Sequence, residues 1–440
     1  MNHKRNTCCV ILNFIIDFAI YFTIFLMLDL KITLFKYLIF WGLYFGYYLL
    51  DVLNFRAYFK MKDFLWCIFL NAFAFFLFYL GHREKRIFIA FLIYTVMEIL
   101  INFLLHNYKK QNINTLIIDE GEYLNSICQI LSHLDNYTYI GFCGNSSGLK
   151  DKSYLGTVNN LKFYVDKYDI GIIIFSKNRM LEEYADILLS MKLKGIKVID
   201  YFTFLEEFEG KIDNDKINSV WVLMTENFCS CERGFEKRLK RIVDLTLAFL
   251  LFFLLAPLMF ITYILVKFDI GIKYIFLNPV KILKNPAFFK QVRIGYRGQE
   301  FKIFKFRSMK VHDPNKYSKY ASKTDDRITA VGHFIRKTRL DELPQIINVI
   351  RGDMSFVGPR PEWNELGREY EKGIKNYNLR YAVQPGITGW AQTMYTYGAS
   401  MDDAKVKLGY DLYYVKNQSF LLDMIILFKT CKTVLFGKGM

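Results

Sequence analysis

Four long apolar segments fill the first quarter of the chain, at residues 8–28, 32–50, 64–80 and 87–105. Each is close to the ~20 residues that cross a bilayer as an α-helix. The pattern predicts a transmembrane four-helix region over residues 1–110. The first segment is too long for the apolar part of a signal peptide and no small-residue cleavage site follows it, so we expect an uncleaved anchor.

Lysines and arginines in the connections predict the orientation of these helices. Four crossings leave both ends of the region on one side of the membrane. Basic residues are enriched in cytoplasmic loops, so the side with more of them is expected to be the cytoplasm. That side holds both ends and carries Lys4, Arg5, Arg56, Lys60, Lys62, Lys109 and Lys110, against Lys31, Arg83, Lys85 and Arg86 on the other.

Between residues 111 and 230 the pattern changes to short β-rich runs that alternate with helical stretches. This alternation is typical of a parallel α/β domain. The expected strands are at 116–119, 137–143, 171–175 and 196–201, and the expected helices at 123–134 and 180–193.

The loop after the first of these strands bears on nucleotide binding. A dinucleotide needs a G-x-G-x-x-G loop, which gives the tight turn and the close approach to the pyrophosphate. This chain has Asp119-Glu120-Gly121-Glu122 there, and three carboxylates would repel the phosphates. We therefore expect a degenerate Rossmann-like domain with a structural or regulatory role and no bound NAD.

A fifth apolar segment, residues 242–266, opens the last region, which we place at 235–440. Pro257 lies a little past the centre of the segment and predicts a kink. Both flanks are basic, and a spanning helix would leave one of them outside. We expect a re-entrant helix that dips into the membrane and returns; the alternative is an ordinary fifth span.

Composition narrows the class of partner. The 440 residues are 53% hydrophobic, yet the net charge is +16. This combination indicates a membrane protein with basic surfaces for anionic lipids or phosphate-bearing ligands, and the apolar segments argue against nucleic acid. The eight cysteines form no C-x-x-C pair, which indicates reduced thiols of a cytoplasmic protein, and the six histidines have no metal-ligand spacing.

Positive charge is concentrated between residues 281 and 340. This stretch contains sixteen lysines and arginines but only four aspartates and glutamates. Within this stretch, FFKQVRIGYRGQEFKIFKFRSM indicates two alternating strands around a turn at residues 295–298. Lys305 and Arg307 would share a face, with phosphate groups as natural partners. The alternative is a solvated basic face that touches anionic lipid.

Two acidic residues, Asp341 and Glu342, follow in TRLDELPQ. Pro344 is favoured in the first turn of a helix, so the pair lies at or before a helix N-terminus. The helix dipole and nearby arginines, Arg336 among them, are expected to lower the carboxylate pKa. An ionised, fixed aspartate can act as a nucleophile or hold Mg²⁺. The alternative is a helix-capping aspartate beside a surface glutamate.

Arg360 stands between Pro359 and Pro361 in GDMSFVGPRPE. Two prolines restrict the backbone on either side of one guanidinium, which suits a phosphate clamp. A rigid turn with an incidental arginine is the alternative. Further on, the glycine-punctuated loop QPGITGWAQ places Trp390 either in a sugar or nucleotide pocket or in the core.

Taken in order, KRIVD before the proline-broken segment, KIFKFRSM, TRLDELPQ, GDMSFVGPRP and QPGITGWAQ resemble the bacterial monotopic phosphoglycosyl transferases. These are the polyprenyl-phosphate glycosyl-1-phosphate transferases of exopolysaccharide, capsule and O-antigen assembly. The resemblance is close over residues 235–440, and the first 230 residues resemble the long form of the family in layout only. One departure is Ala256-Pro257, where such families often have Ser-Pro.

The resemblance implies an α/β membrane protein whose C-terminal α+β catalytic domain is anchored by the re-entrant helix. In the implied reaction, Asp341 attacks the sugar-bearing phosphate of a UDP-sugar, UMP leaves, and the phosphosugar passes to polyprenyl phosphate. Asp341 would be nucleophile and Mg²⁺ ligand, and Glu342 its partner. Arg336, Arg360 and Lys305 would contact phosphates.

The same resemblance implies the bacterial inner (cytoplasmic) membrane, with the catalytic domain on the cytoplasmic face among membrane lipids, and it leaves a homodimer open. Two other functions are alternatives to the implied transferase. A membrane-tethered UDP-sugar dehydratase or epimerase would need a working dinucleotide loop. A non-catalytic scaffold or regulator of polysaccharide synthesis would make Asp341 dispensable.

Overall fold

The computed structural model describes residues 112–119, 123–134, 136–144, 153–176, 178–217, 219–225, 234–269, 284–310, 327–395 and 400–435, with a few single positions besides. The four predicted transmembrane segments lie outside these ranges and stay a prediction. The chain divides into two compact units, Met1–Gly210 and Lys211–Met440, and each is described by itself. The domain limits expected from the sequence also stay a prediction.

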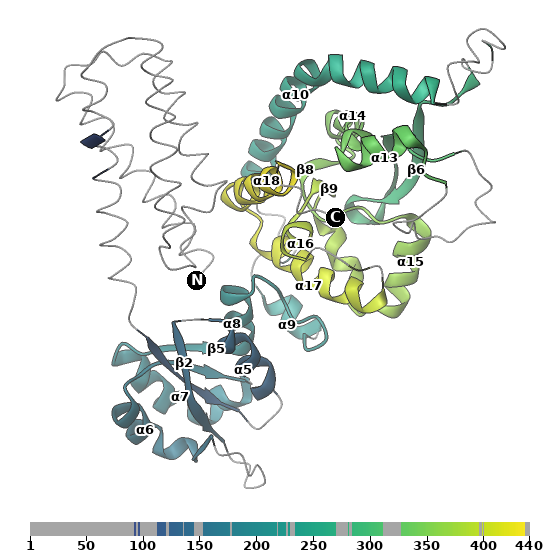
Figure 1. Cartoon of the computed structure of the whole chain (residues 1–440). Coiled ribbons are helices and arrows are strands. Elements are labelled where there is room, and N and C mark those ends of the chain that lie inside the picture. Colours follow the sequence, from purple (N-terminus) through teal and green to yellow (C-terminus); the bar gives the residue numbers. More distant parts are fainter. Residues whose placement is uncertain are drawn as a thin grey trace. The chain divides into compact units, whose positions relative to one another are not determined.

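The first unit contains a five-stranded sheet in the order β3-β2-β1-β4-β5, and all of its pairings are parallel (Figure 1). The expected parallel α/β sheet is therefore confirmed. The strands are β1 (Ile113–Ile118), β2 (Tyr137–Cys143), β3 (Tyr154–Gly156), β4 (Ile170–Phe175) and β5 (Lys197–Asp200).

Helices cover both faces of this sheet, because the strands are apolar on both sides. Leu116 and Ile118 of β1 belong to the core on one face, with Leu161 and Leu188, whereas Ile117 belongs to the core on the other face, with Ile127 and Phe204. Strands buried on both faces are typical of parallel sheets. The helices are α5 (Leu124–Ser132), α6 (Leu161–Tyr168), α7 (Asn178–Leu193) and α8 (Tyr201–Phe208).

Asp119, just after β1, takes the place where a dinucleotide-binding domain has its glycine-rich turn. Its side chain is fully buried, and Oδ2 accepts hydrogen bonds from the backbone N–H groups of Tyr123 (3.0 Å) and Leu124 (2.9 Å). These amides begin α5, and a helix N-terminus is where a bound phosphate would be held. A carboxylate of the chain itself occupies that position.

The second unit begins its regular structure with α9 (Ser219–Met224) and the long helix α10 (Gly234–Phe268). Among the described residues, α10 is the helix long and apolar enough to cross a membrane, and only 11% of its most apolar stretch is buried. Pro257 lies inside it, and the helix is bent (Figure 1). The expected apolar helix interrupted by proline is therefore present.

The N-terminal part of α10 is bonded to the rest of its unit. Arg241 donates to the carbonyls of Val349 (2.6 Å) and Ile350 (2.9 Å). Asp244, which is buried, accepts the backbone N–H of Phe356 at 3.2 Å. These bonds fix the first turns of the helix to segments more than one hundred residues further along the chain.

The C-terminal end of α10 is bonded to the same unit. The side-chain amide of Asn285 donates to the carbonyls of Val266 (3.2 Å) and Lys267 (2.8 Å). Arg307 donates to the carbonyl of Val266 at 3.3 Å and also bonds Asn285. Carbonyl groups at a helix C-terminus lack partners within the helix, and these side chains supply them.

The rest of the unit is a β-hairpin surrounded by short helices. The hairpin of β6 (Phe288–Ile294) and β7 (Glu300–Phe306) is antiparallel and turns at Tyr296–Gly298, as the sequence predicted. A short parallel pair joins β8 (Ser355–Val357) to β9 (Gly386–Thr388). The helices are α13 (Ala330–Lys337), α14 (Gln345–Arg351), α15 (Asn364–Gly373), α16 (Trp390–Met394), α17 (Met401–Asn417) and α18 (Phe420–Leu435).

Candidate active site

The acidic pair lies in a sharp connection between two helices. After α13, Arg339 adopts a left-handed conformation (φ 59°) that turns the chain, and a single 3₁₀ turn holds Asp341 and Glu342. Pro344 then caps α14, which ends at Gly352 with φ 90°. The predicted helix and the position of the pair before its N-terminus are therefore confirmed.

Glu342 is the centre of a charged cluster. Its Oε1 accepts hydrogen bonds from Lys305 Nζ at 2.8 Å and from Arg360 Nη2 at 2.9 Å. Its side chain is 14% exposed, that of Lys305 16% and that of Arg360 35%. Burial disfavours the ionised carboxylate, but Arg360 and Lys305 outweigh burial and hold the pKa of Glu342 well below its usual range.

Asp341 is buried as well, but its surroundings act in the opposite direction. Burial first, and then the neighbouring charge of Glu342, raise the pKa of Asp341, while Lys305 and Arg336 oppose this rise. Arg336 does act to lower this pKa, as expected, but the expected net direction is wrong. Removal of the carboxylate from water outweighs them, and the sequence did not reveal that burial.

The surroundings of Asp341 fit a divalent cation bound jointly with a phosphate. Within the part of the chain that the structure describes, no lysine or arginine forms an ion pair with Asp341, and no group of three or more metal-ligating side chains occurs. Mg²⁺ typically needs only one or two carboxylates beside substrate phosphates. Asp341 is the carboxylate of the pair that could supply one such ligand, since Glu342 is bonded to Lys305 and Arg360.

The candidate cations fall into two groups. Lys305, at the end of β7, and Arg360, in the turn after β8, meet at Glu342, and Arg336 of α13 is close enough to act on the charge of Asp341. Arg307 follows β7 but contacts the carboxyl end of α10 instead. Its side-chain hydrogen-bond partners among the described residues are Val266 of α10 and Asn285, and they do not include the acidic pair.

Asn348, which the sequence reading missed, connects β7 to α14. This fully buried side chain donates to the carbonyl of Lys302 (2.8 Å) and accepts the backbone N–H of Phe304 (3.0 Å). The strand that carries Lys305 is thereby fastened to the helix that follows the acidic pair. An asparagine among apolar helix positions was the only signal in the sequence.

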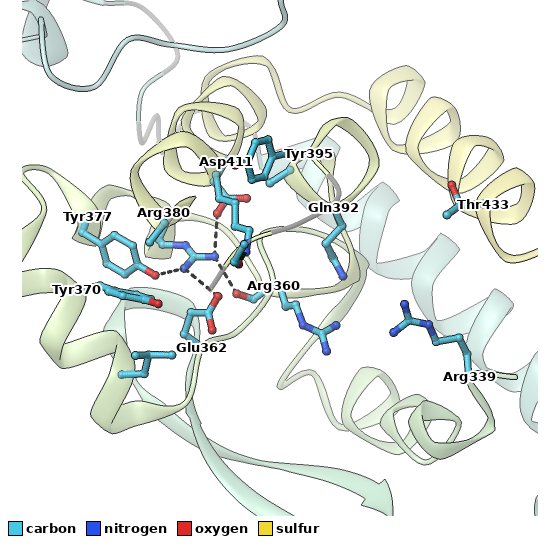
Figure 2. A pocket seen from close by; sticks show the side chains of 15 residues that line it. Arg339, Arg360, Glu362, Tyr370, Tyr377, Arg380, Gln392, Tyr395, Asp411 and Thr433 are labelled. Carbon is cyan, nitrogen blue, oxygen red and sulfur yellow. Dashed lines mark hydrogen bonds and ion pairs between the residues drawn. The ribbon is translucent and has the colours of Figure 1, made fainter. Parts of the chain in front are cut away.

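A cavity of about 410 Å³ adjoins the cluster (Figure 2). Arg360 and Arg339 point into it from one side, and Gln392, Tyr395 and Lys407 also line it. It combines cationic and polar groups, which suits a phosphate-bearing polar ligand.

Trp390 has a packing role in this region. It is 1% exposed, stacks on Tyr413 with ring centroids 5.7 Å apart, and is absent from the residues that line the cavity. Of the two readings of QPGITGWAQ, core packing is therefore the one the structure supports for the tryptophan. Gln392, two residues later, reaches the cavity instead.

Comparison with known proteins gives the family. The model of the family described as bacterial sugar transferase matches residues 235–437. A relative from Aeromonas hydrophila, named UDP-N-acetylgalactosamine-undecaprenyl-phosphate N-acetylgalactosaminephosphotransferase, is 34% identical over 293 residues, which are 66% of this chain and 63% of that protein. Another from Escherichia coli K12, named UDP-glucose:undecaprenyl-phosphate glucose-1-phosphate transferase, is 32% identical over 297 residues, 66% of this chain and 57% of that protein.

The chain thus spans less than two thirds of the length of these two relatives. A third, from Rhizobium leguminosarum bv. phaseoli and named exopolysaccharide production protein PSS, is 38% identical over 209 residues, 46% of this chain and 98% of that protein. The resemblance inferred from the motifs is confirmed. The chain belongs to the bacterial sugar transferase family.

Proposed function

We propose that this protein transfers a sugar 1-phosphate from a UDP-sugar to polyprenyl phosphate, giving a polyprenyl-diphosphate-linked sugar and UMP. The observation that carries the proposal is the buried carboxylate of Asp341 beside the Lys305–Glu342–Arg360 cluster. The names of two relatives, which describe sugar-phosphate transfer involving undecaprenyl phosphate, support it. The product would start the assembly of an exopolysaccharide, capsule or O-antigen.

In the proposed first step, a carboxylate oxygen of Asp341 attacks the phosphorus that bears the sugar. The bond from that phosphorus to the oxygen of the UMP phosphate breaks, and UMP leaves with the electron pair. In the second step, an oxygen of polyprenyl phosphate attacks the same phosphorus and the carboxylate is released. Nothing is oxidised or reduced in either step. Two successive substitutions at one phosphorus take the place of a direct attack by polyprenyl phosphate on the UDP-sugar, both of which are anions.

The cluster suits this chemistry because an anionic nucleophile must approach an anionic diphosphate. Lys305 and Arg360 carry two positive charges against the single negative charge of Glu342, so the cluster remains cationic. Preorganised cations of this kind stabilise the charge that develops on the leaving phosphate. Bound Mg²⁺, held by Asp341 with Glu342 beside it, would neutralise further charge on the diphosphate.

The raised pKa of Asp341 also has a role in the proposal. A carboxylate that burial destabilises is a stronger nucleophile than a solvated one, because ionisation leaves it poorly compensated. Arg336 and Lys305 oppose that rise, because their positive charges favour the ionised carboxylate. Glu342, whose pKa is depressed, stays anionic and orients the two cations; a role as base toward the lipid phosphate is less favoured by this geometry.

The proposal places α10 in the membrane as a re-entrant helix. Both its first turns and its last turn are bonded to one compact unit, as Arg241 and Asn285 illustrate. A straight helix of 35 residues would be about 52 Å long, whereas the hydrocarbon core is about 30 Å thick. A helix that crossed would separate its ends, so entry and return on the cytoplasmic face of the inner membrane fit better.

Transfer from radiolabelled UDP-sugars to undecaprenyl phosphate in nanodiscs tests the proposal. The panel would include UDP-glucose and UDP-N-acetylgalactosamine, with UMP release and EDTA sensitivity followed in parallel. We expect lipid-linked product that depends on magnesium and is absent in Asp341→Asn. Product formed equally well by the Asn variant would refute the covalent mechanism, and absence of product from every sugar would favour the scaffold function.

A further inference from the structure

Hydrogen bonds to three backbone carbonyl groups hold the turn that carries Arg360. Pro359 and Pro361 have no backbone N–H, so their peptide units can be fixed only as hydrogen-bond acceptors. Three successive carbonyls of this turn accept. The donors are Gly386 N to Pro359 O (3.0 Å), Arg380 Nη2 to Arg360 O (2.8 Å) and Arg293 Nη1 to Pro361 O (3.0 Å).

Arg380, which the sequence reading missed, is itself rigidly held. Its guanidinium is almost fully buried and forms an ion pair with Asp411 Oδ2 at 2.8 Å, where the two side chains are 6% and 3% exposed. It also bonds the hydroxyl of Tyr377, and Glu362 Oε1 lies 3.9 Å away. Figure 2 shows these groups around one guanidinium, with the Arg360 carbonyl as a further acceptor.

Arg293, on β6, approaches the same turn from the hairpin. Its Nη2 donates to Gln291 Oε1 at 2.6 Å while Nη1 donates to the Pro361 carbonyl. Burial lowers the pKa of Arg293 to about 10. The adjacent backbone supports this contact, since the N–H of Ile294 donates to the Glu362 carbonyl at 3.2 Å.

A buried guanidinium, that of Arg380, and a partly buried one, that of Arg293, are a costly way to hold a short turn. Removal of a cation from water is unfavourable unless partners compensate it, and neutral donors would hold a carbonyl at a lower cost. What they add is rigidity, because a planar guanidinium donates in two fixed directions at once. Arg380 uses this to join Asp411 to the turn, and Arg293 uses it to join Gln291 to the turn.

We infer that Arg380 and Arg293 are positioning residues, which fix the Pro359–Pro361 turn and thereby hold the Arg360 guanidinium against Glu342 beside Lys305. This inference rests on the proposed function for its catalytic consequence. The structural part, a turn whose rigidity depends on one buried and one partly buried arginine, stands without it.

Arg380→Lys and Arg293→Lys test the inference, because each keeps the charge but cannot donate in two fixed directions. A displacement of about 1 Å at a reacting group costs on the order of 10²-fold in rate. We expect each variant to lose on the order of 10- to 100-fold in kcat, with a smaller change in KM for the UDP-sugar. Arg368→Lys, whose side chain is 50% exposed in its pair with Glu371, is the matched control and should keep full activity.

The decisive comparison uses Arg360→Met as background. If Arg380 acts through Arg360, then Arg380→Lys adds no further loss once the Arg360 guanidinium is gone. Losses that multiply in the double variant would overturn the inference, because they would mean that Arg380 acts independently. If Arg380→Lys does not fold, the same cycle with Arg293→Lys decides the question.

Hydrogen exchange separates this inference from the proposed function. In the full-length protein in nanodiscs, peptides that cover residues 358–363 should exchange about tenfold faster or more in both lysine variants, while peptides from α14 keep the wild-type rate. This result is expected whichever reaction the enzyme catalyses. Unchanged exchange at 358–363 would overturn the inference, whereas absence of lipid-linked product from the wild type would count against the proposed function alone.

Discussion

Replacement of Glu342 by glutamine removes one negative charge from the cluster and hardly changes the volume of the side chain. The amide keeps the shape of the side chain and one acceptor oxygen, but Lys305 and Arg360 lose the carboxylate that both of them contact. Lys305 is then a buried cation without an opposite charge at bonding distance. We expect a less stable second unit as well as a slower enzyme.

The size of the effect follows from the geometry. At 2.8 and 2.9 Å, with an effective dielectric constant of about 20, each attraction amounts to about 6 kcal/mol before desolvation. Desolvation offsets much of this, and loss of one partner from a buried pair costs about 3–5 kcal/mol. Arg360 is 35% exposed and water screens it, so we expect the lower end, about 3 kcal/mol.

A thermal melt of the full chain in nanodiscs, followed by tryptophan fluorescence, measures this loss. For a unit of this size, 3 kcal/mol corresponds to a fall in Tm of about 6–12 °C. The matched control is Asp402→Asn, because Asp402 is 92% exposed in its pair with Lys405 and such pairs contribute below about 1 kcal/mol.

The pH dependence gives a second check. A depressed pKa stabilises the folded state above the unfolded glutamate pKa of about 4.3, and this contribution is lost as the pH falls further. The difference between wild type and Glu342→Gln should therefore be constant from pH 6 to 8 and shrink below pH 4. A fall in Tm of less than 2 °C at pH 7.5 would refute the view that Glu342 organises the two cations.

Three further predictions follow from single contacts. Asp341→Asn should abolish transfer yet raise Tm at pH 7.5, because burial raises the pKa of Asp341 and its ionisation therefore costs the folded state stability. This gain in Tm should vanish below pH 4, and a lower Tm at pH 7.5 would contradict the prediction. Asp119→Ala should destabilise the first unit by about 1–2 kcal/mol in a chemical denaturation curve, through loss of two bonds to the start of α5, and should not create NAD binding by calorimetry. Arg307→Met should lower Tm by the equivalent of about 1–3 kcal/mol, because the Val266 carbonyl loses its donor, and should leave KM for the UDP-sugar unchanged. A large rise in KM would instead mean that Arg307 contacts the substrate phosphates.

Local signals in the sequence were sufficient for several elements. Pro344 and Gly352 marked the two ends of α14, and alternation with a glycine-bounded turn marked the β6–β7 hairpin. The parallel sheet of the first unit was predictable from its apolar runs, although the short strand β3 and the helices α6 and α8 were missed. Each success depended on residues close together in the chain.

Long-range burial was what the sequence could not supply. The pKa of Asp341 was predicted in the wrong direction, because the local charges were visible and the loss of water was not. Arg307 was expected to share the role of Lys305 by strand alternation, but it follows the last residue of β7 and reaches α10. Arg380 stands in no motif; only the fold brings Asp411 and the Arg360 carbonyl to it.

The two ends of α10 are fastened at different times during synthesis. Its C-terminal carbonyls are bonded by Asn285 and Arg307, which are 19 and 41 residues later than Val266. Its N-terminal turns are bonded to residues that lie 108 to 183 positions further along the chain. The most distant of these is Asp423, which pairs with Lys240. The ribosome must therefore synthesise residues 349–356 before both ends of the helix are bonded, and a chain that stops soon after residue 310 would carry an apolar helix secured at one end only.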